Sequence, residues 1–206
     1  MNAPVEILHG YICDRLRLCE YTDIQKGVAF VKNTISYWQT AGFLFVSVVG
    51  TLLHFLFDWT GGNVIVALFS AVNESIWEHL KLLFYPMLAF ALAEYFAWGG
   101  GVESFWCIKL MGLLLGLAVI PVAYYTYTGV FGVNADWVNI TIFFLAAGLV
   151  FWVETKLFER EYTCRMQSGP ALLLIGLIAV LFTVLTFKPP HIPLFQDPVT
   201  QHYGYQ

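Results

Sequence analysis

Residues 171–187 read ALLLIGLIAVLFTVLTF, a stretch that contains no charged side chain. A helix needs about 20 predominantly apolar residues to cross the hydrocarbon layer of a bilayer, so this stretch predicts a membrane-spanning helix. Four comparable stretches precede it in the chain, at residues 41–57, 82–98, 111–128 and 137–153. The sequence therefore predicts an all-α integral membrane protein built as a bundle of five transmembrane helices.

The composition of the whole chain of 206 residues supports this class. Hydrophobic residues make up 59% and charged residues 12%, whereas a soluble protein is about a quarter charged. A soluble fold of this size leaves much of its surface in water and could not hide so much apolar area. These values exclude a disordered chain, a nucleic-acid-binding protein and almost any water-soluble enzyme, and they make membrane lipids the expected partners.

A further apolar stretch, residues 64–72, is too short to cross a bilayer alone and leads into a polar segment. Lys and Arg in short loops favour the cytoplasm. The segments 1–40 and 154–170 contain four and three Lys or Arg residues, whereas the loops 58–63 and 129–136 contain none. This asymmetry favours five spans plus one re-entrant or interfacial helix, with six spans as the alternative. It also predicts a multi-pass protein of the inner (plasma) membrane with a cytoplasmic N-terminus.

Three regions follow from this arrangement. Residues 1–40 mix apolar and basic side chains, which is typical of an amphipathic segment at the cytoplasmic membrane surface. Residues 41–187 form the transmembrane bundle. Residues 188–206 form an extracytoplasmic tail with several prolines, whose apolar side chains predict that it folds back over the outer surface of the protein.

Isolated residues in the spans carry weaker signals. Glu94 alone interrupts the second span, and one acid by itself indicates no function. Gly112 and Gly116 have the small-xxx-small spacing of a helix-packing face. The cysteines match no metal-site spacing and fall near the predicted inner side, where free thiols are expected: Cys13, Cys19, Cys107 and Cys164.

Five spans bring several polar segments of the chain to one side of the membrane. His54 and Asp58 lie one helical turn apart at the end of the first span, a spacing at which both can bind one metal. Asn134 and Asp136 follow the third span, and His191 follows the fifth. Polar groups in or beside a membrane are costly and tend to mark function, so this side is the predicted functional side.

Residues 73–81 read NESIWEHLK, the densest polar segment of the chain. If this segment is a helix, Glu74, Glu78 and Lys81 form one charged face. On an adjacent face the Ser75 hydroxyl pairs with the His79 imidazole. Such a set can supply metal ligands, a general base, or a nucleophile beside its base. The structural alternative is a capped Glu–Lys ladder on an interfacial helix.

The first functional hypothesis is a metal-dependent hydrolase that acts on a lipid or other amphiphile at the extracytoplasmic side. Its divalent metal, zinc by the type of ligand, is expected to be bound by His54, Asp58, His79 and His191. Glu78 or Glu74 is the predicted general base, and Lys81 is predicted to stabilise negative charge. Ser75 is the predicted catalytic hydroxyl beside its base.

Two hypotheses from other classes stay open. The first is a small-solute or cation transporter or binding protein, in which a broken helix and its carboxylates form the site. The second is a membrane scaffold whose acidic helix binds a partner. The sequence defines neither the substrate nor the oligomeric state.

The segment NESIWEHLK resembles a signature, Asn-Glu-Ser-x-Trp-Glu-His-x-Lys, of an uncharacterised family of small bacterial integral membrane proteins. The resemblance extends to residues 50–55 (GTLLHF) and 189–195 (PPHIPLF), and so covers most of the chain from about residue 42. It implies a membrane-embedded helical fold and no known chemistry.

A second similarity is to the alkaline ceramidase-like membrane metallohydrolases, which place Ser-x-x-x-His, an Asp and His-x-x-x-His around zinc on seven helices. Ser75 and His79 match the first of these elements, and Asp58 corresponds to the acid. The spacing from His191 to His202 departs from His-x-x-x-His, and five spans are fewer than seven. The similarity implies a zinc hydrolase only by analogy.

Overall fold

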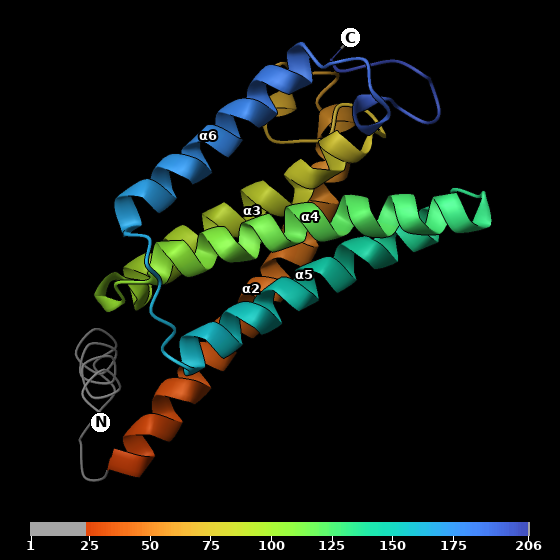
Figure 1. Ribbon diagram of the computed structural model, residues 1–206. Coiled ribbons are helices and arrows are strands. Elements are labelled where there is room, and N and C mark those ends of the chain that lie inside the picture. Colours follow the sequence, from red (N-terminus) through yellow and green to blue (C-terminus); the bar gives the residue numbers. More distant parts are fainter. Residues whose placement is uncertain (1–23, 206) are drawn as a thin grey trace.

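The computed structural model describes residues 24–205, and these form a bundle of helices without strands (Figure 1). The helices are α2 (Ile24–Trp59), α3 (Ile76–Ala97), α4 (Phe105–Phe131), α5 (Asp136–Glu159) and α6 (Ser168–Phe187). Each is long and apolar enough to cross a membrane. The predicted all-α architecture with five spanning helices is confirmed.

The first helix is longer than its predicted span. α2 runs without a break from Ile24 to Trp59, so residues 24–40 of the predicted N-terminal segment continue directly into the first span. Val31, Ile35 and Gln39 recur every four residues and are buried, which places one face of this extension against the bundle. Residues 1–23, with Cys13 and Cys19, lie outside the described part of the chain.

The predicted sixth segment differs most from the structure. Instead of a separate helix over 64–81, the chain makes one 3₁₀ turn, Val66–Leu68, and then an irregular segment that ends at Ser75. From Ile76 onward the polar segment forms the first turns of α3 itself. The reason is local, because the Ser75 side chain accepts a hydrogen bond from the Glu78 N–H and so begins the helix there.

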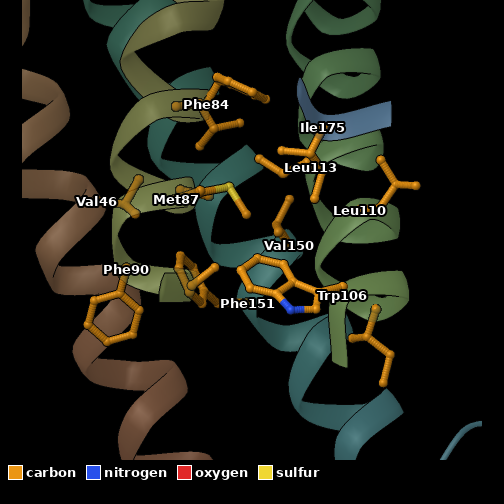
Figure 2. Packing of buried hydrophobic residues seen from close by; sticks show 14 of the residues in the cluster. Val46, Phe84, Met87, Phe90, Trp106, Leu110, Leu113, Val150, Phe151 and Ile175 are labelled. Atoms are coloured by element: carbon orange, nitrogen blue, oxygen red, sulfur yellow. The ribbon is translucent and has the colours of Figure 1, made fainter. Parts of the chain in front are cut away.

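The core lies where α3, α4 and α5 meet (Figure 2). Large side chains of α3 point from one side into the space shared with α4 and α5, among them Phe84 and Met87. A Cβ atom added at Gly116 would lie 2.4 Å from Leu83 Cδ2 and 3.1 Å from Val150 Cγ2. The predicted packing role of this glycine is therefore confirmed, because only the missing side chain lets the helices approach so closely.

Three irregular parts of the chain gather at one end of the bundle, which we call the site end: residues 60–75, the α4–α5 turn at 132–135, and the tail at 188–205 (Figure 1). The Tyr205 N–H donates to the Thr186 carbonyl at 2.8 Å, and its hydroxyl donates to the Gly62 carbonyl at 3.1 Å. The Asn73 amide donates to the Gly204 carbonyl at 3.0 Å. The tail thus folds back over the bundle, as the sequence predicted.

The opposite end carries a disulfide. Cys107, near the start of α4, is joined to Cys164 in the α5–α6 loop, with 6.4 Å between the two Cα atoms. The prediction of free thiols was wrong for this pair. A separation of 57 residues gives no local signal of pairing, and only the approach of the two helix ends reveals it.

Candidate functional site

The NESIWEHLK segment divides into two groups because the helix begins in its middle. Ser75 is the N-cap of α3, so Glu74 precedes the helix and does not share a face with Glu78. The Asn73 side-chain oxygen accepts from the Ser75 N–H at 2.9 Å and fixes the turn before the helix. Glu74 consequently turns toward α2, while Glu78 turns into the protein.

Glu74 lies between two imidazoles. Its Oε1 is 3.7 Å from His54 Nε2, and its Oε2 is 3.4 Å from His79 Nε2. The two rings are 5.2 Å apart, centroid to centroid. One ligand atom from each of the three residues lies within 4.8 Å of the other two, which makes them, among the described residues, the group able to hold a metal ion. We call His54, Glu74 and His79 the His–Glu cluster.

The orientation of the His79 ring suits a metal ligand. Its Nδ1 lies 2.9 Å from the Ser75 carbonyl oxygen, which can only accept a hydrogen bond. Nδ1 therefore carries the proton in the neutral ring, and the lone pair of Nε2 points toward Glu74. Metal-binding histidines commonly have this arrangement, because the second hydrogen bond fixes the tautomer and the ring orientation.

The His–Glu cluster lines a cavity of about 490 Å³. Apolar side chains of α2, α3, α4 and α5 form most of its wall, among them Leu82, Ile120 and Phe143. The polar groups that line it come from three stretches of chain distant in sequence: Thr51, His54, Glu74, His79, Tyr124, Asn134, Asp136 and Asn139. The cavity therefore combines an apolar wall with a set of polar groups, as an amphiphilic ligand requires.

The α4–α5 turn contributes an ordered polar edge to this cavity. The Tyr127 hydroxyl donates to Asn139 Oδ1 at 2.6 Å, and the Asn139 amide donates to Asn134 Oδ1 at 2.9 Å. Asp136, the first residue of α5, lines the cavity beside them and is exposed. The sequence placed Asn134 and Asp136 on this side, but nothing in it indicated Asn139.

The tail closes part of the cavity rim through Pro198 and Val199. The Asp197 side chain holds this turn, since it accepts hydrogen bonds from the Val199 N–H at 2.7 Å and the Thr200 hydroxyl at 2.9 Å. Burial acts to raise the pKa of Asp197, but these hydrogen bonds and one from the Glu74 N–H outweigh it and lower the pKa below its ordinary value. The ionised carboxylate thus joins the tail to the cluster segment.

Glu78 and Lys81, predicted as base and as stabiliser of negative charge, lie elsewhere. They form an ion pair of 2.5 Å that is almost fully buried. Lys81 also donates to the Ala67 carbonyl at 2.8 Å, and the Thr186 hydroxyl donates to Glu78 at 2.9 Å. This pair joins α3, α6 and the 3₁₀ turn and does not line the cavity, so its role is to hold the site end together. Ser75 serves as the helix cap.

The predicted ligands His191 and Asp58 are not in the His–Glu cluster. The His191 ring stacks on Tyr203 within the tail, with 4.6 Å between ring centroids. Asp58 is exposed at the end of α2 and acts on His54 only as a nearby charge. The expectation of three gathered imidazoles is therefore corrected to two, with Glu74 in the place of the third.

Comparison with known proteins identifies a family. The model of a Family of unknown function (DUF6512) matches residues 29–205, from the described first helix to the end of the tail. Neither a curated protein nor a solved structure matches the chain. The matched region contains the bundle from the second turn of α2 onward, the His–Glu cluster and the cavity, and the chain belongs to this family of unknown function (DUF6512).

Proposed function

We propose that the protein is a membrane-embedded, metal-dependent hydrolase of an amphiphilic substrate. The observation that carries this proposal is the convergence of His54, Glu74 and His79 at a cavity with a mostly apolar wall. Two histidines and one glutamate are a ligand set of catalytic zinc sites, in which the fourth position binds water or substrate. Zinc lowers the pKa of a bound water to about 7 and so supplies a nucleophile at neutral pH.

The other groups of the cavity have roles that fit this chemistry. Glu74, first considered as a base, is better used as the third ligand, because its two oxygens face both imidazoles. Asp136 takes the role of general acid–base group, since it is the other carboxylate that lines the cavity. The apolar wall accepts the hydrocarbon part of the substrate, and the amides of Asn134 and Asn139 face its polar part.

The proposal is tested on protein purified in detergent without added chelator. Elemental analysis is expected to find about one zinc per chain. The protein is then incubated with long-chain acyl esters, acyl amides and phosphodiesters, and products are measured by mass spectrometry. Chelation is expected to abolish hydrolysis of one class and added zinc to restore it.

Asp136→Asn is the variant that separates catalysis from metal binding. We expect it to keep the zinc and to lower the hydrolysis rate by about 10²–10⁴-fold, the usual contribution of a general acid–base group. Unchanged hydrolysis after complete metal removal would contradict the proposal. Bound metal without turnover of any substrate class would instead support the cation-binding or transport alternative.

We infer that the N-terminus is cytoplasmic, which puts the site end on the outer side. The absence of Lys and Arg from residues 129–136 supports this orientation. The Cys107–Cys164 disulfide argues against it, because disulfides are rare in the cytoplasm and this one lies at the opposite end.

A pair of cysteine substitutions at exposed positions decides the orientation. Val133→Cys lies in the α4–α5 turn, and Thr163→Cys lies in the α5–α6 loop. A membrane-impermeant maleimide applied to intact cells is expected to label Val133→Cys, and to label Thr163→Cys only after permeabilisation. The reverse pattern would place the cavity on the cytoplasmic side.

A further inference from the structure

A second polar group lies inside the bundle, away from the cavity. Each of four helices contributes one side chain to it: Gln39 from α2, Glu94 from α3, Lys109 from α4 and Glu154 from α5. All four are at most 3% exposed. Glu94 follows His79 by fifteen positions on α3, about 22 Å along the helix, so this group is distinct from the His–Glu cluster.

The lysine stands between the two carboxylates. Lys109 Nζ donates to Glu154 Oε2 at 2.6 Å and also forms an ion pair with Glu94 Oε2. The Gln39 amide donates to Glu94 Oε1 at 2.7 Å. A Cβ atom at Gly112 would lie 2.1 Å from Glu154 Oε1, so this glycine makes the room for the carboxylate.

Three aromatic rings lie near the ammonium group. The centroids of Phe105, Phe151 and Phe158 lie 5.5–5.8 Å from Lys109 Nζ. The charged groups that act on the three ionisable members all belong to the group: Lys109 acts on Glu94, both carboxylates act on Lys109, and Lys109 and Glu94 act on Glu154. α6, which packs against α4, has no ionisable side chain within Ser168–Phe187. The group is thus electrically isolated within the described part of the bundle.

Two carboxylates and one ammonium carry a net charge of −1 when all are ionised. A buried, uncompensated charge is highly unfavourable, and a buried carboxylate responds by binding a proton. The Glu78–Lys81 pair shows the balanced alternative, since one acid and one base there leave no residual charge. The second group therefore has one acid too many for its single lysine.

Three buried acceptors in the group accept no hydrogen bond from any described residue: Gln39 Oε1, Glu94 Oε2 and Glu154 Oε1. Glu94 Oε2 has its ion pair with Lys109, which leaves Gln39 Oε1 and Glu154 Oε1 without a polar partner. A proton on a carboxyl converts one acceptor into a donor, so a single proton removes the excess charge and supplies a missing hydrogen bond. We propose that Glu94, Lys109 and Glu154 form an intramembrane proton-binding site that holds one exchangeable proton on one of its two carboxyls.

Infrared spectroscopy of the purified protein tests this proposal, because a protonated carboxyl has a C=O stretching band that ionised carboxylates lack. At about pH 6, where exposed Asp and Glu are ionised, wild-type protein is expected to show a band equivalent to one carboxyl per chain. The band is expected to shift in D₂O and to disappear on alkalinisation. Glu94→Gln and Glu154→Gln are each expected to abolish it, because either variant leaves one acid paired with Lys109.

Glu78→Gln is the matched control, since it alters a buried pair that needs no proton, and the band is expected to stay. Absence of the band from wild-type protein at about pH 6 would overturn the proposal without any variant. A band that persists in both Glu94→Gln and Glu154→Gln would overturn it as well. A band that appears only in sodium-free buffer would assign the excess charge to a bound sodium ion instead.

Discussion

Replacing His79 by alanine is expected to remove the bound metal and with it the hydrolytic activity. The substitution deletes one of three ligands and the hydrogen bond by which the Ser75 carbonyl orients the ring. Loss of a partner that merely orients a ligand costs about 10–100-fold in metal affinity, so loss of the ligand itself should exceed about 100-fold. Elemental analysis of the purified variant and titration with zinc measure this loss.

His191→Ala is the control, because this histidine stacks on Tyr203 in the tail and is outside the His–Glu cluster. It is expected to keep about one zinc per chain and full activity. Loss of the metal from His191→Ala together with retention in His79→Ala would contradict the assignment of ligands. Such a result would place the metal at a site that includes His191 and excludes His79.

Replacing Lys109 by methionine is expected to give the largest loss of stability in the protein. Methionine approximates the length of the side chain but leaves Glu94 and Glu154 buried without a cation. Removing one partner of a buried ion pair typically destabilises a protein by about 3–5 kcal/mol, and here one lysine serves two acids. Denaturant unfolding in detergent micelles measures the change in the free energy of unfolding.

Two comparisons make this result specific. Lys156→Met removes a half-exposed lysine whose ion pair with Glu159 measures 2.8 Å, and it should cost less than about 1 kcal/mol. Adding Glu94→Gln and Glu154→Gln to Lys109→Met is expected to recover most of the stability, since no buried charge remains. Equal losses for Lys109→Met and Lys156→Met would show that the buried group does not contribute to folding.

The sequence predicted the spans well because a long apolar stretch in a membrane has few alternatives to a helix. It placed their ends poorly, as at α2, where residues 24–40 carry charges yet continue the helix. Charged residues do not end the helix there, because one buried face suffices to extend a helix along its neighbours.

The site was predicted only in part, for reasons that concern single residues. Helical spacing grouped Glu74 with Glu78, but the Ser75 cap puts Glu74 outside the helix and sends the two carboxylates in opposite directions. His191 was expected near His54, and the tail has enough internal contacts to hold it elsewhere. Glu94 looked isolated because its partner Lys109 lies on the next helix and Glu154 lies on the one after it.

The contacts of the tail have a practical consequence for purification. Tyr205 hydrogen-bonds to both Thr186 and Gly62, and Gly204 has a positive φ of 67° with the Thr186 carbonyl where a Cβ would lie. An affinity tag inserted directly behind Tyr205 would strain these anchors. A tag placed ahead of α2 in the sequence leaves the contacts of Gly204 and Tyr205 unchanged.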